Sequence, residues 1–61
     1  MKLTAGEIVT IEIDGNVLKL KIEDASKGDI ISGRVESVLS GDVYSVGQIC
    51  DFERTQIQTA E

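Results

Sequence analysis

Apolar and polar residues alternate with a period of two over most of the chain, a pattern typical of half-buried β-strands rather than helices. Residues 7–13 place Val9, Ile11 and Ile13 on one face, and residues 17–23 continue the alternation with leucine and isoleucine on one face and lysine on the other. Between them lie an aspartate, a glycine and an asparagine, which tolerate positive φ and favour a tight turn. The pattern predicts an antiparallel hairpin.

Two registers of this hairpin keep the same residues on the inner face. A turn centred on Gly15-Asn16 sets Glu12 opposite Lys19, whereas a turn centred on Asp14-Gly15 sets Thr10 opposite Lys19. Opposite charges facing each other across two strands contribute ~0.2–1 kcal/mol. We therefore predict the Gly15-Asn16 turn.

Three more strands are expected after a loop over residues 24–28. Their predicted ranges are 29–39, 43–46 and 48–54. In the first of them, Ile31, Val35 and Leu39 share the inner face, and Gly33 is expected to bend the strand, since glycine inside a strand often marks a bulge, a bend or a close approach of another backbone.

A tight turn over residues 55–57 is expected to close the end of the core with Ile57, and residues 58–61 are expected to fray. No helix of useful length fits the pattern. Five short strands with glycine-centred turns predict an all-β fold, a five-stranded antiparallel small barrel with a short closing turn near the C-terminus. Residues 1–61 would form this single domain.

The stretch from residue 28 to residue 57 resembles the small SH3-like β-barrels, a group that includes the Sm-like and Tudor-like barrels. The residues that carry the resemblance are Gly28-Asp29-x-x-x-Gly33-x-Val35, then Val46-Gly47-x-x-Cys50-x-Phe52, and finally Ile57. The resemblance implies a bent, glycine-containing middle strand, a further strand led by glycine, and a closing turn. It implies no particular activity, because this architecture hosts unrelated functions.

The composition removes several kinds of catalytic and metal site. The 61 residues include no His and a single Cys. Nucleophile pairs that depend on imidazole are therefore impossible, as are an internal disulfide and a cysteine-rich zinc site. The carboxylates are scattered, and Cys50, which alternates with Phe52 on the inner face, is expected to be buried and inert. We expect no enzyme, no cofactor and no metal site.

The chain begins without the apolar run of a signal peptide, and no stretch approaches the length of a membrane span. Together with the lone cysteine, which indicates a reducing compartment, this predicts a cytoplasmic protein that does not enter membranes. Eleven acidic residues against six basic ones give a net charge of −5. That balance argues against general nucleic-acid binding, which depends on neutralising phosphates.

Several aliphatic residues fall on the polar face of their predicted strands. The predicted partner-binding residues are Ile8, Ile30, Val38 and Ile49, with Tyr44 at their edge. They could form one exposed patch, or the strands could bend enough to draw them inside. Because a small domain with a thin core gains stability by covering such a patch, we predict a non-catalytic interaction module that forms a homo-oligomer or docks on a protein partner.

A small basic group is the other candidate surface. Lys19, Lys21 and Arg34 are predicted to share the outer face of the second and third strands. Such a group could bind a phosphate or an acidic partner, or it could pair with neighbouring glutamates across the strands. The alternative function is therefore a nucleic-acid-binding module of the Sm-like or SH3-like kind.

Overall fold

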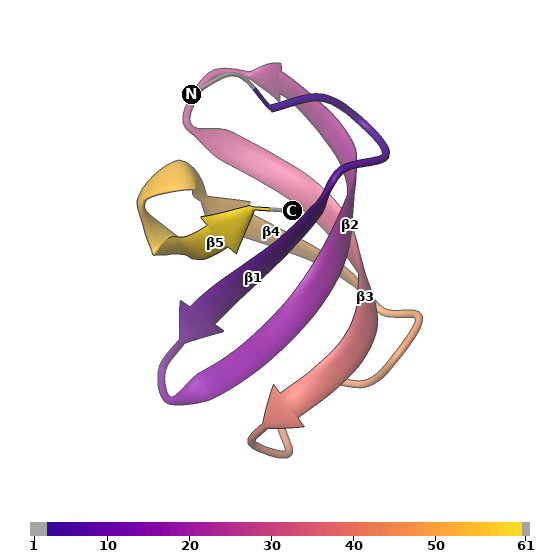
Figure 1. Ribbon diagram of the computed structural model, residues 1–61, viewed down its shortest axis with the longest axis vertical. Helices are drawn as coiled ribbons and strands as arrows, with labels where there is room; N and C mark the ends of the chain where they lie inside the picture. The colour runs from indigo at the N-terminus through magenta and orange to yellow at the C-terminus, as the bar shows by residue number, and fades with distance from the viewer. Residues whose placement is uncertain (1–2, 61) are drawn as a thin grey trace.

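Five β-strands and one turn of 3₁₀ helix make up the part of the chain that the computed structural model describes, residues 3–60 (Figure 1). They are β1 (Ile8–Ile13), β2 (Asn16–Lys27), β3 (Ile30–Ser40), β4 (Ile49–Glu53), η1 (Arg54–Gln56) and β5 (Ile57–Ala60). All five strands lie in one antiparallel sheet with the order β4-β3-β2-β1-β5. Among the described residues β4 does not pair with β5. The all-β, five-stranded antiparallel fold is confirmed, whereas closure into a barrel is not.

The β1–β2 hairpin adopts the register that we did not favour. Thr10 lies opposite Lys19 and Ile13 opposite Asn16, so the turn is centred on Asp14-Gly15. Both turn residues have positive φ, 48° and 84°, as the tightest hairpin turns require. The buried Asn16 side chain stabilises this turn, because its amide Nδ2 donates to the Ile13 carbonyl at 3.0 Å. The geometry of the turn therefore outweighs one exposed ion pair, and the Gly15-Asn16 prediction was wrong.

Strand β2 is longer than the sequence pattern indicated. It continues to Lys27, so most of the predicted loop over residues 24–28 is strand. Asp24 pairs with Ser32 and Lys27 with Ile30, with register shifts between these pairs. Such bulges bend a strand without ending its pairing, and Figure 1 shows β2 and β3 as long, strongly curved ribbons.

A register shift also exchanges the faces of two residues near the end of β3. Leu20 pairs with Val35 and Lys19 with Ser37, so Glu36 is an extra residue on β3. One extra residue inverts the alternation beyond it. Val38 therefore packs against the core, and Leu39 is 57% exposed, the reverse of what the simple alternation predicts.

The C-terminal part differs from expectation at two places. Residues 43–46 form no strand but belong to a connection, residues 41–48, between β3 and β4. Residues 58–60 do not fray, because β5 pairs with the free edge of β1, where unpaired backbone groups require partners. Glu61 lies outside the described residues. The predicted closing turn is present as η1, and Ile57 packs against the core, as predicted.

The core lies on the inner side of the curved sheet. Its buried residues are Leu3, Val9, Ile11, Leu18, Leu20, Ile22, Ile31, Val35, Cys50 and Phe52. Gly33 pairs with Ile22 on one side and with Cys50 on the other. A Cβ atom at this position would lie 3.2 Å from the Leu20 Cβ and 3.3 Å from the Phe52 ring. Glycine suits this position because neighbouring side chains approach the backbone closely.

Candidate functional site

One row of side chains crosses the outer face of four neighbouring strands. Ile8 of β1 pairs with Lys21 of β2, Lys21 pairs with Arg34 of β3, and Arg34 pairs with Ile49 of β4. Each of the four has a chain neighbour that is buried in the core, so the four point outward, and Ile8 is half-buried. We call this set the outer-face row. It places two cations side by side between two isoleucines.

The predicted basic group is brought together by this arrangement. Lys21 lies directly opposite Arg34, and Lys19 lies two residues from Lys21 on the same face, opposite Ser37. Like charges directly opposite each other on two strands are destabilising. The alignment therefore has an electrostatic cost in the free protein.

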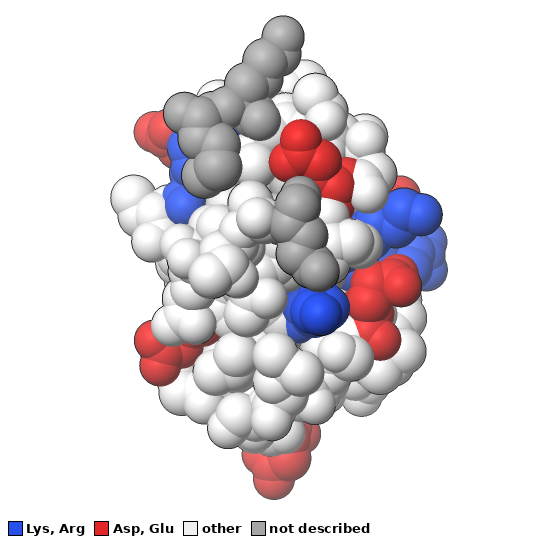
Figure 2. All heavy atoms as spheres, viewed as in Figure 1, with Lys and Arg blue, Asp and Glu red and all other residues white. Residues whose placement is uncertain are grey.

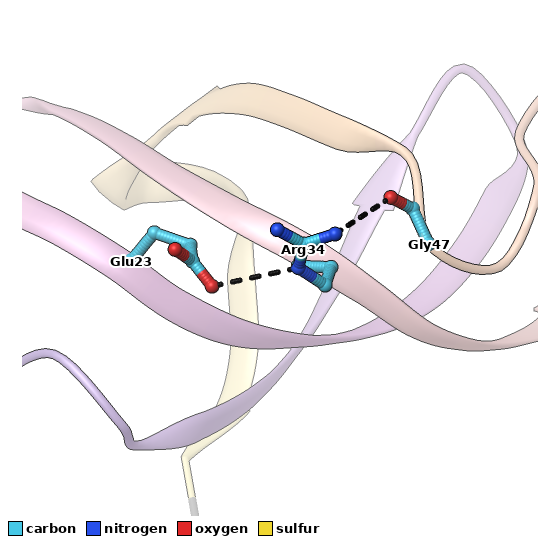
Figure 3. A network of polar contacts seen from close by, with 3 residues as sticks. All are labelled: Glu23, Arg34 and Gly47. Atoms are coloured by element: carbon cyan, nitrogen blue, oxygen red, sulfur yellow. Dashed lines mark hydrogen bonds and ion pairs between the residues drawn. The ribbon is translucent and has the colours of Figure 1, made fainter.

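Two contacts orient the Arg34 side chain, and Figure 3 shows the guanidinium between them. Its Nε lies 3.6 Å from the Glu23 carboxylate of β2, and its Nη1 donates to the Gly47 carbonyl at 3.3 Å. Both side chains of the ion pair are about half exposed, which limits its contribution to stability. The contacts engage two of the five N–H donors of the guanidinium.

The structure does not bring the five predicted partner-binding residues into one patch. Val38 and Tyr44 pack against the core. Ile30 lies opposite Glu53 at the far end of β4, four residues along β3 from Arg34. Ile8 and Ile49 are separated by the two cations of the outer-face row. The outward placement of Val38 is thus corrected, and only part of the set remains available on the surface.

The sequence pattern predicted Ile49 at the surface but missed the exposed aliphatic residues near it. The β3–β4 connection and its two flanks expose Leu39 (57%), Val43 (67%), Val46 (67%) and Ile49 (51%). Alternation alone assigned Val43 and Val46 to a strand. The glycines at 41 and 47 were the signal for a loop, because both have positive φ, 95° and 91°.

Backbone hydrogen bonds hold the end of this connection against β3. The Gly47 N–H donates to the Val35 carbonyl at 2.8 Å, and the Val35 N–H donates to the Gln48 carbonyl at 2.9 Å. Within the connection, the Ser45 N–H donates to the Gln48 side-chain oxygen at 3.0 Å. The exposed valines therefore lie on an ordered loop. Figure 2 shows a broad uncharged area in the lower half of the view, with both acidic and basic side chains at its edges.

Cys50 is not placed for nucleophilic chemistry. Burial of its thiol raises the pKa, and the neighbouring Asp51 carboxylate raises it further. A thiol with a raised pKa forms little of the reactive thiolate at neutral pH.

Two of the carboxylates accept hydrogen bonds from serine hydroxyls. Asp51 accepts a hydrogen bond of 2.6 Å from the Ser32 hydroxyl. Asp24 accepts one of 2.6 Å from the Ser26 hydroxyl, which lowers the pKa of that carboxyl. Residues 3–60 contain no group of three or more Cys, Asp or Glu side chains that could hold a metal ion.

A shallow depression lies elsewhere on the molecule. It has a volume of about 300 Å³ and is lined by residues 3–5 and by Glu23, Asp24, Ala25 and Ser26. Its polar side chains already have partners, because the Ser26 hydroxyl donates to the Asp24 carboxylate and Glu23 pairs with Arg34. The outer-face row and the β3–β4 connection are therefore the two candidate surfaces.

Comparison with protein-family models, with curated proteins and with solved structures gives no match to this chain. Within residues 3–60, no helix is long and apolar enough to cross a membrane.

Proposed function

We propose that this chain is a non-catalytic interaction module that self-associates by burying the exposed aliphatic residues of the β3–β4 connection. The observation that supports the proposal is the exposure of Val43 and Val46, each 67%, on an ordered loop flanked by the similarly exposed Leu39 and Ile49. Single exposed aliphatics are ordinary on a protein surface, but a group of them on one short segment is typical of an interface.

A second copy of the chain is the occupant that the local charge favours. Asp42 is the only charged residue in the connection, although the chain as a whole carries −5. Two copies can therefore bring this segment together with little repulsion, whereas their acidic surfaces elsewhere repel each other. Complete burial of an aliphatic side chain contributes ~1.5–3 kcal/mol, before the entropic cost of association.

We also propose that the domain is an SH3-like small barrel that works in the cytoplasm. The strand order β4-β3-β2-β1-β5, the bent second strand and the 3₁₀ turn before the last strand support the first part. A buried, unpaired cysteine supports the second. This fold adds no activity to the proposal, since binding depends on the surface residues that it displays.

Sedimentation equilibrium over a range of protein concentrations tests self-association. The wild-type chain should form a dimer with a dissociation constant in roughly the micromolar range. The double substitution Val43→Ser, Val46→Ser should weaken the dimer by about tenfold, equivalent to ~1.4 kcal/mol. Ile30→Ser is the matched control, because it removes an exposed aliphatic from another part of the sheet. A wild-type chain that stays monomeric, or a control as weak as the double variant, would overturn the proposal.

The alternative of a nucleic-acid-binding module rests on the alignment of Lys21 with Arg34, with Lys19 on the same face. The net charge of −5 weighs against it, since the acidic surface of the chain repels a polyanion. A gel-shift titration with a single-stranded oligonucleotide at low salt distinguishes the two functions. Absence of a shift at about tens of micromolar protein would eliminate this alternative, because phosphate-driven binding is strongest at low ionic strength.

A further inference from the structure

We propose that the outer-face row binds an extended segment of another protein in which an acidic residue is flanked, two positions away on each side, by an aliphatic residue. The segment would cross the four strands, with its acid between Lys21 and Arg34 and its aliphatics on Ile8 and Ile49. This inference rests on the proposed function of an interaction module and names the chemistry of a second partner.

The cation pair is the first argument for an acidic ligand. Lys21 and Arg34 face each other directly, which is unfavourable in the free protein. Glu23 engages Arg34, but Lys21 forms no ion pair within residues 3–60. A carboxylate placed between the two cations would relieve the repulsion and form charge-assisted hydrogen bonds with both.

The orientation of Arg34 is the second argument. Its Nε and Nη1 are directed to Glu23 and to the Gly47 carbonyl, as Figure 3 shows, so the guanidinium is held over the sheet before any ligand binds. The donors that these contacts leave are available for a carboxylate. An arginine that is already ordered loses less side-chain entropy on binding than a free one.

The spacing of the row defines the ligand pattern. Neighbouring strands lie about 4.8 Å apart, so Ile8 and Ile49 are separated by about 14 Å across three strand intervals. An extended peptide advances about 3.3 Å per residue and places every second side chain on one face. Residues i and i+4 of such a peptide are thus about 13 Å apart, with residue i+2 between the two cations. The pattern is aliphatic-x-acidic-x-aliphatic.

The chain itself does not supply this pattern on its surface. Glu7 is the one acidic residue with aliphatic residues at both flanking positions, Ala5 and Val9. Val9 is completely buried in the core. The ligand is therefore a different protein. A polyanion such as nucleic acid is disfavoured, because the chain carries −5 and only a short cationic stretch is available.

Fluorescence anisotropy with a labelled peptide of the sequence Ser-Leu-Thr-Glu-Thr-Leu-Ser tests the proposal. The wild-type chain should bind it with a dissociation constant of roughly 0.1–1 mM, as expected for a small exposed surface. Peptides with Gln in place of Glu, or Ser in place of both Leu residues, should bind roughly five- to tenfold more weakly. Lys21→Gln and Arg34→Gln should each weaken binding of the original peptide to a similar extent.

Lys27→Gln is the matched control, since it removes an exposed lysine near the end of β2, outside the row. It should leave peptide affinity within about twofold, and circular dichroism of each variant checks that the fold is intact. Equal binding of the Glu and Gln peptides, no binding at millimolar protein, or equal losses in Lys21→Gln and Lys27→Gln would each overturn the proposal. Tighter binding of a thymidine oligonucleotide that depends on Lys21 would overturn it in favour of nucleic acid.

The two proposals are tested separately, although Ile49 lies at the edge of both surfaces. Val43→Ser, Val46→Ser should weaken self-association but leave peptide affinity unchanged, because neither residue belongs to the outer-face row. Loss of peptide binding with intact dimerisation would reject the peptide ligand alone. Peptide binding by a strictly monomeric wild-type chain would support the outer-face row as a peptide-binding surface. It would reject self-association through the connection.

Discussion

Two hairpins of this protein, β1–β2 and β3–β4, use the same antiparallel pairing but differ in how far their aliphatic residues are buried. In the β1–β2 hairpin, a two-residue turn at Asp14-Gly15 joins strands whose inward residues, such as Ile11 and Leu18, are completely buried. In the β3–β4 hairpin, the eight-residue connection over 41–48 joins strands that leave several aliphatics exposed. A tight turn fixes the register of every following pair, whereas a longer connection can present side chains that the core does not need.

Besides the pairing of β2 with β3, a side-chain contact joins the two hairpins at their ends. The Asn16 side chain begins β2 and lies against Gly41 at the start of the connection, so closely that a Cβ atom at Gly41 would overlap it. The same side chain donates to the Ile13 carbonyl. The β1–β2 hairpin therefore supports the start of the exposed connection. Substitutions in each hairpin can test whether its aliphatic residues stabilise the core or lie exposed at the surface.

The largest expected difference between the two hairpins comes from leucine truncation. Leu18→Ala removes a completely buried side chain and should lower the free energy of unfolding by ~2–5 kcal/mol. Leu39→Ala, the same change at a 57% exposed position, should alter it by less than ~0.5 kcal/mol. Urea denaturation measures both. If Leu18→Ala is unfolded without urea, Ile11→Val provides a milder core change of ~0.5–1.5 kcal/mol.

Comparable losses for the two leucine variants would mean that Leu39 is covered by something other than solvent, and the contrast between the hairpins would be lost. Measurement at several protein concentrations distinguishes coverage by a second copy, because the stability of a dimer rises with concentration.

The contact between the hairpins is tested by two glycine substitutions. Gly41 and Gly47 both have positive φ, but only Gly41 lies against another residue, Asn16. Gly47→Ala should destabilise the fold by ~1–2 kcal/mol through backbone strain alone. Gly41→Ala should lower the free energy of unfolding by about 1–3 kcal/mol more than Gly47→Ala, because the displaced Asn16 amide loses its buried hydrogen bond. Thermal unfolding compares the two variants.

Adding Asn16→Ala to each glycine variant sharpens this test. The extra loss in Gly41→Ala should shrink in the double variant, since the side chain that it displaces is already gone. Strict additivity of Gly41→Ala and Asn16→Ala would show that the contact does not couple the hairpins.

A smaller effect on the stability of the fold is expected at alkaline pH, and it arises from Cys50 in the β3–β4 hairpin. Burial raises the pKa of the Cys50 thiol, so the folded state holds this proton more tightly than the unfolded chain. The resulting stabilisation is fully present below the unfolded pKa, about 8.5, and is lost as the pH rises through the folded value. The urea midpoint of the wild type should fall more steeply above this pH than that of Cys50→Ala. Parallel profiles would contradict the burial of the thiol.

The smallest effect on the stability of the fold is expected at acidic pH, and it arises from Asp24 in β2. The Ser26 hydroxyl and the Ser26 N–H lower the pKa of the exposed Asp24 carboxyl. The stabilisation is present above the unfolded pKa, about 3.9, and is lost as the pH falls through the folded value. NMR titration should show a higher pKa for Asp24 in Ser26→Ala. An unchanged pKa would mean that the hydroxyl does not hold this carboxylate in solution.

The strands themselves were largely predictable, because local alternation needs no tertiary information. The pattern located β1, β3 and β4 to within one or two residues and identified the faces that bury Val9, Ile11 and Leu20. It also predicted the group that contains Lys21 and Arg34, since outward positions on neighbouring strands fall together. It could not predict their direct opposition, which depends on the register shifts between β2 and β3.

The amino-acid sequence by itself determined that this protein is an all-β fold of antiparallel strands with an inward-facing cysteine, because alternation and turn-forming residues act over a few neighbouring positions. Only the tertiary structure decided the hairpin register, the reversal of Val38 and Leu39, and the pairing of β5 with β1. These depend on bulges and on backbone groups distant in the chain, whose hydrogen bonds must be satisfied together.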